Sequence, residues 1–257
     1  MARVAMGVEY DGTDFVGWQE QRNGRSVQAS LAAAVTEVAN ESITVHGAGR
    51  TDAGVHAAGQ VVHFDTSAQR TARQWALGVN ANLPDDIAVR WAREVDVDFD
   101  ARRSAVWRLY RYQVLQQETR SALERRRSWW VRETLDHAAM TAAAVAWLGE
   151  NDFSAFRASG CQSHSPMRRL LAVGVRADGC MLALDFQANA FLHHMVRNLV
   201  GVLVEIGRGS EPVEWAGELM RARDRTLGGV TSPPQGLTLV HVHYSERYDL
   251  PYNEAYA

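Results

Sequence analysis

Residues 43–65, ITVHGAGRTDAGVHAAGQVVHFD, decide the fold. Apolar residues alternate with other residues at both ends of this stretch, over 43–48 and 60–65, and the alternation predicts two strands. The glycine-rich middle predicts the connection between them. Two strands in direct succession indicate an antiparallel sheet, with the stretch at the centre of a β-α-β-β-α-β order.

The flanking sequence supplies the rest of that order. Before the stretch, a strand is predicted over 3–10, ended by the turn signal Asp11-Gly12-Thr13-Asp14, and a helix over 26–40 with Ser26 as its cap. After the stretch, a helix is predicted over 71–83, stopped by Pro84, and a strand over 87–95.

The second half of the chain repeats the order with one extra helix. Its predicted strands lie at 104–116, 169–175, 181–187 and 236–244, and its predicted helices at 134–148, 191–206 and 213–223. We therefore predict an α/β (α+β) protein with two split βαβ subdomains on antiparallel sheets, residues 1–101 and 102–257. A duplicated unit of this kind predicts a cleft where the two halves meet.

The composition excludes several classes of enzyme. All 27 basic residues among the 257 are arginine, against 30 acidic residues. Without lysine the chain has no P-loop lysine, no lysine Schiff base to a cofactor and no lysine general base. The net charge of −3 and the isoelectric point near 6.3 argue weakly against indiscriminate binding to nucleic acid or membranes.

The cysteines and the apolar segments indicate the compartment. Cys161 and Cys180 are too few for a disulfide framework and lack C-x-x-C spacing, so we expect reduced thiols. The N-terminal residues meet Glu9 before an apolar core develops, which argues against a secretory leader. The longest uncharged run, 226–245, contains paired glycines and paired prolines and predicts no spanning helix. We therefore expect a cytoplasmic protein.

One segment departs from the average charge. Residues 102–132 hold nine arginines and two acidic residues, a net charge of +7. Five aromatic residues lie among them: Trp107, Tyr110, Tyr112, Trp129 and Trp130. Guanidinium groups suit phosphates and flat rings suit unstacked bases, so this arginine-aromatic segment favours an RNA-binding face. A solvated strand and loop is the alternative reading of the same residues.

The glycine-rich connection presents an acid beside a base. Three glycines surround Arg50-Thr51-Asp52, and glycine permits positive φ and close approach to a ligand. A structural turn seldom needs so many polar groups together. The G-x-G-x-x-D spacing lacks the third glycine and the βα context of a dinucleotide site. The spacing alone leaves open whether this loop is functional or structural.

A second polar group lies at 188–201, ANAFLHHMVRNLVG. Its apolar residues have helical spacing, and His193 and Arg197, four apart, are expected to share a different face of that helix. Adjacent His193 and His194 should point apart on a helix and so form a poor pair for one metal. No H-E-x-x-H or C-x-x-C set completes a zinc site, and no G-x-S-x-G indicates a Ser/His/Asp triad. We predict no metal site.

The loop sequence Gly49-Arg-Thr-Asp-Ala-Gly-Val-His56 is similar to the catalytic motif of the tRNA pseudouridine synthase A (TruA) family. The resemblance spans nearly the whole chain in order and continues through residues 108–112, 149–153, 189–201, 224–226 and 236–237. It implies two RNP-like halves with the active cleft between them. It also implies a cofactor-free isomerase that converts uridine to pseudouridine at positions 38, 39 and 40 of the tRNA anticodon stem-loop.

The same resemblance implies roles for individual residues. Asp52 matches the catalytic carboxylate, Tyr110 the tyrosine that stacks on the target base, and Arg197 the arginine that pairs with the aspartate. Arg50 is implied to help displace and replace the flipped base. The resemblance further implies a homodimer whose bound tRNA crosses both subunits.

Two rival functions fit part of the sequence. A non-catalytic RNA-binding or RNA-folding module would use the arginine-aromatic segment but would leave the Arg50-Thr51-Asp52 loop without a purpose. A glycosidase-like hydrolase would use Asp52 on another nucleoside. Such enzymes usually need two carboxylates, and no second acid accompanies Asp52 in its motif.

Overall fold

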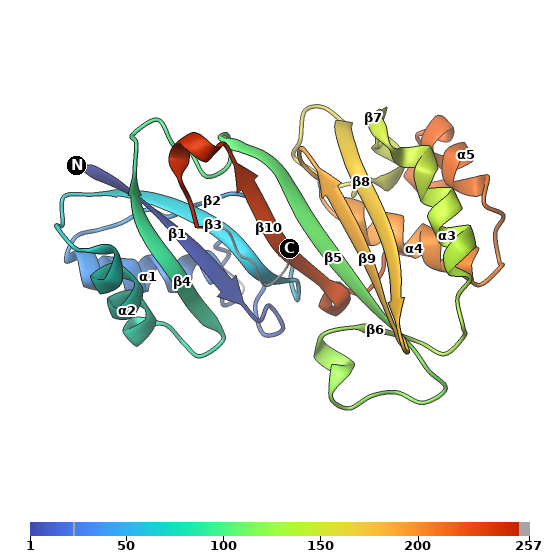
Figure 1. Cartoon of the computed structure of the whole chain (residues 1–257), viewed down its shortest axis with the longest axis horizontal. Helices are drawn as coiled ribbons and strands as arrows, with labels where there is room; N and C mark the ends of the chain where they lie inside the picture. The colour runs from blue at the N-terminus through green and yellow to red at the C-terminus, as the bar shows by residue number, and fades with distance from the viewer. Residues whose placement is uncertain (23, 252–257) are drawn as a thin grey trace. The chain divides into compact units, whose positions relative to one another are not determined.

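The computed structural model describes residues 1–22 and 24–251 and divides the chain into two compact units (Figure 1). Unit 1 comprises residues 1–108 and 238–257, of which 252–257 lie outside the described residues, and unit 2 comprises residues 109–237. This division differs from the predicted one, which assigned residues 102–257 to a single subdomain. The last strand, β10 (Leu237–Tyr244), belongs mostly to unit 1 because it lies parallel to β3 (His56–Thr66), with Thr238 opposite His56.

The sheet of unit 1 has the strand order β4-β1-β3-β10. The strands β1 (Ala2–Tyr10) and β4 (Ile87–Val95) match their predictions and run antiparallel to each other, and β3 pairs antiparallel with β1. The predicted strand at 43–48 is wrong in extent. Of these residues, the strand β2 contains only His46–Gly47, which pair with β3. The Ile43 N–H donates to the Thr36 hydroxyl instead, so this backbone is held by a helix rather than by a strand.

Two helices pack against each other in unit 1. Helix α1 (Val27–Ala39) begins after Ser26, whose side chain accepts a hydrogen bond from the Ala29 N–H, as predicted for a cap. Helix α2 (Ala72–Asn82) begins with a capping box at Thr71 and ends two residues before Pro84. Phe64 of β3 meets Trp75 of α2 edge to face, with ring centroids 5.2 Å apart, so the core lies between the sheet and the helices.

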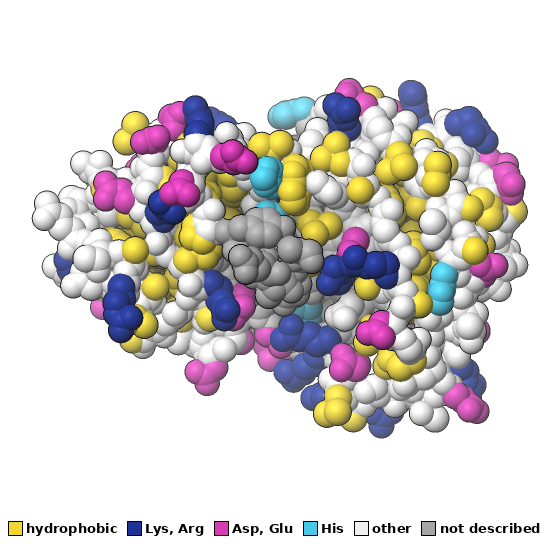
Figure 2. Space-filling view, in the orientation of Figure 1, with side chains coloured by type: hydrophobic (Ala, Val, Ile, Leu, Met, Phe, Trp, Pro, Cys, Tyr) yellow, Lys and Arg dark blue, Asp and Glu magenta, His cyan; other side chains and the backbone are white. Residues whose placement is uncertain are grey.

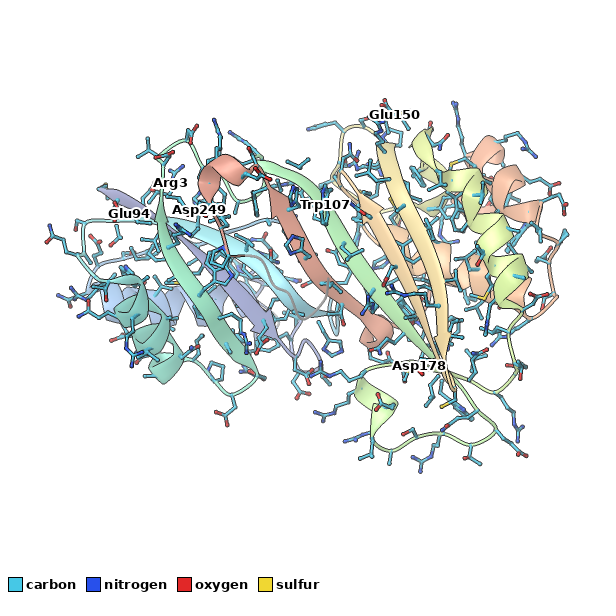
Figure 3. All side chains as sticks on the ribbon, viewed as in Figure 1. Arg3, Glu94, Trp107, Glu150, Asp178 and Asp249 are labelled. Carbon is cyan, nitrogen blue, oxygen red and sulfur yellow. The ribbon has the colours of Figure 1, made fainter. Side chains whose placement is uncertain are left out.

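The sheet of unit 2 has the strand order β5-β9-β8-β7. Its strands are β5 (Ala105–Gln116, of which residues 105–108 belong to unit 1), β7 (Gly149–Asp152), β8 (Met167–Asp178) and β9 (Met181–Ala188). The short strand β6 (Trp129–Val131) runs parallel to β5. The turn between β8 and β9 lies beside Asp178 in Figure 3. The sequence did not predict β6 or β7.

Three helices belong to unit 2: α3 (His137–Ala144), α4 (Met195–Gly207) and α5 (Trp215–Ala222). The expected start of α4 at residue 191 is wrong, because His194 has a left-handed φ of +62° that breaks the helix before Met195. His193 therefore precedes the helix. Its ring lies 4.1 Å from that of His194, between centroids, so the two histidines do not point apart as expected.

Short 3-10 helices complete the described structure, at Glu124–Arg126, Val145–Trp147, Ser154–Phe156, Arg225–Leu227, Pro234–Gly236 and Glu246–Tyr248. Within residues 1–22 and 24–251, no helix has both the length and the apolar character needed to cross a bilayer.

Candidate active site

The Asp52 loop, which we define as residues 48–55, connects β2 to β3 in unit 1. Asp52 is half-buried, whereas Arg50 is exposed. The Val55 N–H donates to the Asp52 carbonyl at 3.1 Å, and Gly54 between them has a φ of +77°. A turn with positive φ at its third residue requires glycine or a close substitute, so Gly54 fixes the backbone that carries the carboxylate.

Three backbone carbonyls of the Asp52 loop accept hydrogen bonds from residues outside it. The donors are Arg108 to residue 48 (3.0 Å), Gln60 to residue 49 (2.9 Å) and the Trp18 N–H to residue 51 (3.0 Å). Arg108 and Gln60 are buried, so these bonds are shielded from competing water. The backbone that leads to Asp52 is therefore held at residues 48, 49 and 51.

The Thr51 side chain adds a buried contact directly beside Asp52. The Tyr10 and Thr51 hydroxyls lie 2.8 Å apart, and both residues are buried. Burial raises the pKa of the Tyr10 phenol to about 12, so the phenol stays neutral at physiological pH. The contact at Thr51, the residue next to Asp52, is thus made by uncharged groups.

The far side of the loop packs on the chain that follows β1. The Gly12 N–H donates to His56 Nδ1 at 3.0 Å. A Cβ atom on Gly12 would lie 2.0 Å from the Val55 carbonyl oxygen, closer than any real contact. Backbone therefore meets backbone at the end of the Asp52 turn, and no side chain larger than hydrogen fits between them.

The other two predicted site residues lie in unit 2. Tyr110 comes from β5, has 8% of its surface exposed, and meets the Phe191 ring edge to face at 5.1 Å between centroids. Arg197 comes from α4, is half-buried, and donates through Nε to the Ser232 carbonyl at 2.8 Å. Each unit thus carries two of the four predicted residues: Asp52 and Arg50 in unit 1, Tyr110 and Arg197 in unit 2.

The arginine-aromatic segment does not form one uniform face. Arg108 is buried under the Asp52 loop, Arg111 forms an ion pair with Asp185 at 2.7 Å, and Trp107 stacks on His243 at 4.7 Å between centroids. On the face drawn in Figure 2, basic and acidic side chains are interspersed. Arg125 and Arg126, in the 3-10 helix Glu124–Arg126, are exposed, and so is Arg127. These three arginines keep the predicted positive charge at one end of the segment.

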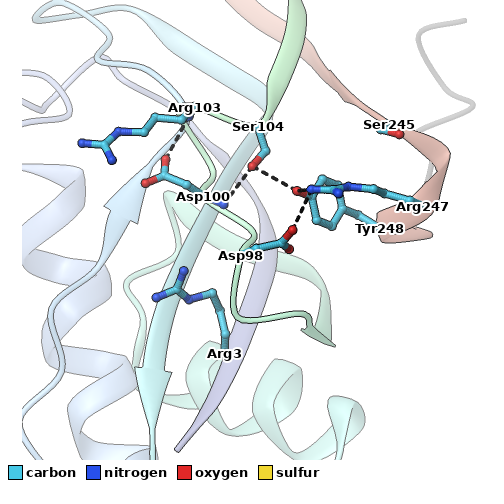
Figure 4. A pocket seen from close by; sticks show the side chains of 8 residues that line it. All are labelled: Arg3, Asp98, Asp100, Arg103, Ser104, Ser245, Arg247 and Tyr248. Atoms are coloured by element: carbon cyan, nitrogen blue, oxygen red, sulfur yellow. Dashed lines mark hydrogen bonds and ion pairs between the residues drawn. The ribbon is translucent and has the colours of Figure 1, made fainter.

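A polar pocket in unit 1 is structural (Figure 4). Its charged groups have partners within unit 1: Arg247 forms an ion pair with Asp98 at 2.8 Å, and Arg3 donates to the Phe99 carbonyl, also at 2.8 Å. The pocket lies toward the start of β1, whereas Tyr10, which contacts the Asp52 loop, is the last residue of that strand. Contacts around the pocket therefore connect residues 245–248 to the 96–104 connection.

Comparison with known proteins places these features in a family. A sequence model of tRNA pseudouridine synthases matches residues 6–102 and 143–245. A tRNA pseudouridine synthase A of Klebsiella pneumoniae subsp. pneumoniae is 51% identical over 251 residues, which cover 98% of this chain and 93% of that protein. The protein of the same name from an Escherichia coli strain is 52% identical over 249 residues, covering 97% and 92%.

The chain belongs to the tRNA pseudouridine synthase family. Among solved structures, a Cbf5-Nop10-Gar1 complex matches with a TM-score of 0.37 and 10% identity, and covers 92% of this chain. This chain spans 48% of the length of that matched chain. Within the family match, the two matched ranges include Asp52, Arg50 and Arg197 and leave out Tyr110.

The residues that hold the Asp52 loop carry no sequence signal as a set. Tyr10 is the last residue of a predicted strand, and its partner Thr51 is 41 positions away. Arg108 is one of nine arginines in a segment that predicts RNA contacts, yet it bonds to backbone inside unit 1. These three residues hold the backbone that carries Asp52.

Proposed function

We propose that this chain is an isomerase that converts uridine to pseudouridine in tRNA, with Asp52 as the catalytic carboxylate. The observation that carries the proposal is the Asp52 loop: one half-buried acid on a backbone held by buried hydrogen bonds, within a family match that includes it. Active-site groups need such support because small displacements of a catalytic group are costly.

The reaction suits a single carboxylate. The N1–C1′ bond breaks, the uracil turns, and C5 bonds to C1′, while C5 loses one proton and N1 gains one. No net oxidation occurs and no group leaves. The Asp52 carboxylate can attack C1′, stabilise positive charge at C1′, or take the C2′ proton to give a glycal. All three routes use the carboxylate form of the side chain.

We propose that the residues of unit 2 act on the same nucleotide. The Tyr110 ring would stack on the extruded base, and stacking of this kind contributes about 1–3 kcal/mol, which offsets part of the cost of unstacking. Arg197 would supply a positive charge that persists when desolvated, because guanidinium does not deprotonate in proteins. Arg50, exposed on the Asp52 loop, would help displace and replace the flipped base.

We also propose the finer assignments implied by the resemblance. The target uridines lie at positions 38, 39 and 40 of the anticodon stem-loop, and the enzyme works as a cytoplasmic homodimer without metal or cofactor. Light scattering of the purified chain tests the dimer, and fluorescence microscopy of the tagged chain in living cells tests the compartment. A monomeric mass at working concentration or a membrane-associated signal contradicts the respective assignment.

The deciding experiment maps pseudouridine chemically in tRNA incubated with the protein. Asp52→Asn removes the carboxylate with little change in shape and should lower the rate by more than about 10³-fold. Asp85→Asn, at an exposed residue of the same unit, is the matched control and should behave as wild type. A near wild-type rate for Asp52→Asn would overturn the assignment.

The same assay separates the rival functions. A non-catalytic RNA-binding module would bind tRNA and leave its uridines unchanged. A glycosidase-like hydrolase would release free uracil and leave an abasic site. Only the isomerase gives pseudouridine with no free base.

Binding to tRNA has a separate test in the exposed arginines 125–127. Charge reversal at all three should weaken binding and flatten the dependence of log affinity on log salt, because each lost phosphate contact lowers the slope by about 0.9 in duplex regions. Reversal of Arg70 and Arg73, exposed in unit 1 near the start of α2, is the matched control. An unchanged salt slope would mean that arginines 125–127 do not touch RNA.

A further inference from the structure

A segment of unit 2, residues 228–233, lies across helix α4; we call it the α4 strap. The Ser232 N–H donates to the Arg197 carbonyl at 3.1 Å, and Arg197 Nε donates to the Ser232 carbonyl at 2.8 Å. One turn further along α4, a Cβ on Gly201 would lie 1.9 Å from the Val230 carbonyl oxygen. The strap therefore contacts the backbone of α4 directly, at Arg197 and again at Gly201.

A cluster of three side chains holds the start of the strap. Arg225 donates to the Asn198 side-chain oxygen at 3.1 Å and to the Thr231 hydroxyl at 3.0 Å. The Thr231 hydroxyl donates to the same Asn198 oxygen at 2.7 Å, and the Asn198 amide donates to the Phe156 carbonyl at 2.8 Å. Asn198 is 2% exposed, so it joins strap, helix and the 3-10 helix Ser154–Phe156 in the interior of unit 2.

The far end of the strap is held independently. The Tyr112 hydroxyl, on β5, donates to the Pro233 carbonyl at 2.7 Å. Burial raises the pKa of the Tyr112 phenol, so it remains a neutral donor. Ser232 is thus fixed from both sides, by Thr231 before it and Pro233 after it.

The Arg225 side chain is a poor source of stability for the fold. Within the part of unit 2 that the structure describes, its hydrogen-bond acceptors are an amide and a hydroxyl and include no carboxylate. Burial partly desolvates this half-buried guanidinium and so lowers its pKa. A half-buried cation without an acidic partner contributes little to stability. Its geometric effect, the placement of Thr231, is the better explanation.

We infer that Arg225 and Asn198 are positioning residues: they fix the α4 strap, whose Ser232 carbonyl orients the Arg197 guanidinium for the reaction. This inference rests on the proposed function, in which Arg197 acts on the substrate. A free arginine side chain has many rotamers, so a fixed acceptor at Nε settles the plane of the guanidinium in advance. Prepositioned charge is worth more to a reaction than charge that must be ordered during it.

The test is single-turnover pseudouridine formation with saturating enzyme, together with tRNA affinity from filter binding. Arg225→Met keeps the length of the side chain and removes its donors. We expect the single-turnover rate to fall about 10- to 100-fold, the loss associated with ångström-scale misplacement, and tRNA affinity to change less than about threefold. Arg225→Lys restores a donor and should recover part of the rate. Arg221→Met, at an exposed arginine on α5, is the matched control.

A double variant separates positioning from general destabilisation. If Arg225 acts only through Arg197, Arg197→Met with Arg225→Met is no slower than Arg197→Met alone. Rates are normalised to the folded fraction measured by circular dichroism at the assay temperature. An Arg225→Met rate equal to wild type, additive losses in the double variant, or a loss confined to tRNA affinity would each overturn the inference.

Failure of the inference is distinguishable from failure of the proposed function. If wild type forms no pseudouridine, or Asp52→Asn stays active, the proposed function fails whatever Arg225→Met does. If wild type is active and Asp52→Asn is not, an unchanged Arg225→Met rejects the positioning role alone.

Discussion

The Asp52 loop of unit 1 and the α4 strap of unit 2 hold their candidate site residues, Asp52 and Arg197, in different ways. The loop is anchored by buried groups, with Tyr10 4% and Gln60 0% exposed, and its backbone packs against the backbone at Gly12. The strap is anchored by the half-buried Arg225 together with the buried Asn198 and Tyr112, and its residues 228–231 are themselves half-buried or exposed, although Ser232 is buried. Interior contacts resist displacement more than surface ones do. The carboxylate is therefore placed by the core of its unit, and the arginine by a segment that can move at lower cost.

Gly12→Ala is the strongest test of this difference between the loop and the strap. The added Cβ meets the Val55 carbonyl at 2.0 Å, and both backbones belong to buried structure, so we expect a loss of about 3 kcal/mol in unfolding free energy. Gly49→Ala, in the same loop with nothing within 4 Å of its Cβ, is the matched control. Urea titration measures both. A loss below about 1 kcal/mol for Gly12→Ala would show that the loop is not rigidly packed.

Gly201→Ala makes the corresponding change at the strap. The clash distance is similar, 1.9 Å, but the strap can shift outward and alanine favours the helix by about 1 kcal/mol. We expect a net loss of only about 1–2 kcal/mol in unfolding free energy, together with a fall of about tenfold in the single-turnover rate. A loss of stability equal to that of Gly12→Ala would mean that loop and strap are equally rigid.

Tyr10→Phe sharpens the comparison on the side of the loop. It removes the hydroxyl 2.8 Å from Thr51 and leaves a buried threonine hydroxyl without that partner, which costs about 1–1.5 kcal/mol. The turnover rate should fall as well, because Thr51 precedes Asp52. Tyr248→Phe, at a tyrosine of the polar pocket, should cost stability without lowering the normalised rate. Equal effects of the two variants on turnover would contradict the role of Tyr10.

Acid should loosen unit 1 before unit 2. Burial lowers the pKa of His63 and of His241 to about 4, and both belong to unit 1. The folded pKa lies below the unfolded value near 6.5, so their contribution is complete above about pH 6.5 and is lost as pH falls toward 4. Each histidine adds a slope of up to about 1.4 kcal/mol per pH unit.

Hydrogen exchange between about pH 6.5 and pH 5 measures that loss in each unit separately. Protection of unit 1 amides should fall, and His63→Gln should remove roughly the slope of one proton. Charges near His63 act in both directions: His46 and Arg3 lower its pKa, whereas Asp100 and Asp65 raise it. Equal loss of protection in the two units would contradict the assignment.

The parts of the fold that follow local patterns were predictable. Strands were predicted where β1 and β4 lie, and Ser26 and Pro84 mark the limits of the unit 1 helices. The strand expected at 43–48 shrinks to two residues because a hydroxyl on α1 takes the Ile43 N–H, a contact between separate elements. The start of α4 was misplaced because a left-handed histidine has no periodicity to announce it.

The candidate site was also predictable only in part. The Asp52 loop stood out because its glycines and charges are adjacent in sequence. Its supports did not, since Gln60, Arg108 and Trp18 come from separate elements and meet only in the folded unit. The strap cluster was also missed: residues 224–226 matched the family without any role, and the partner of Arg225 is 27 positions away on α4.

The discontinuity of unit 1 has a consequence for synthesis on the ribosome. All of unit 2 lies between residues 109 and 237, and the strand that borders β3 in unit 1 is made after it. Domains fold in the order in which their residues emerge. The emerging chain therefore completes the unit that carries the arginine first. Strand β10 is translated after unit 2, so a chain terminated before it retains the Asp52 loop and lacks a strand that pairs with β3.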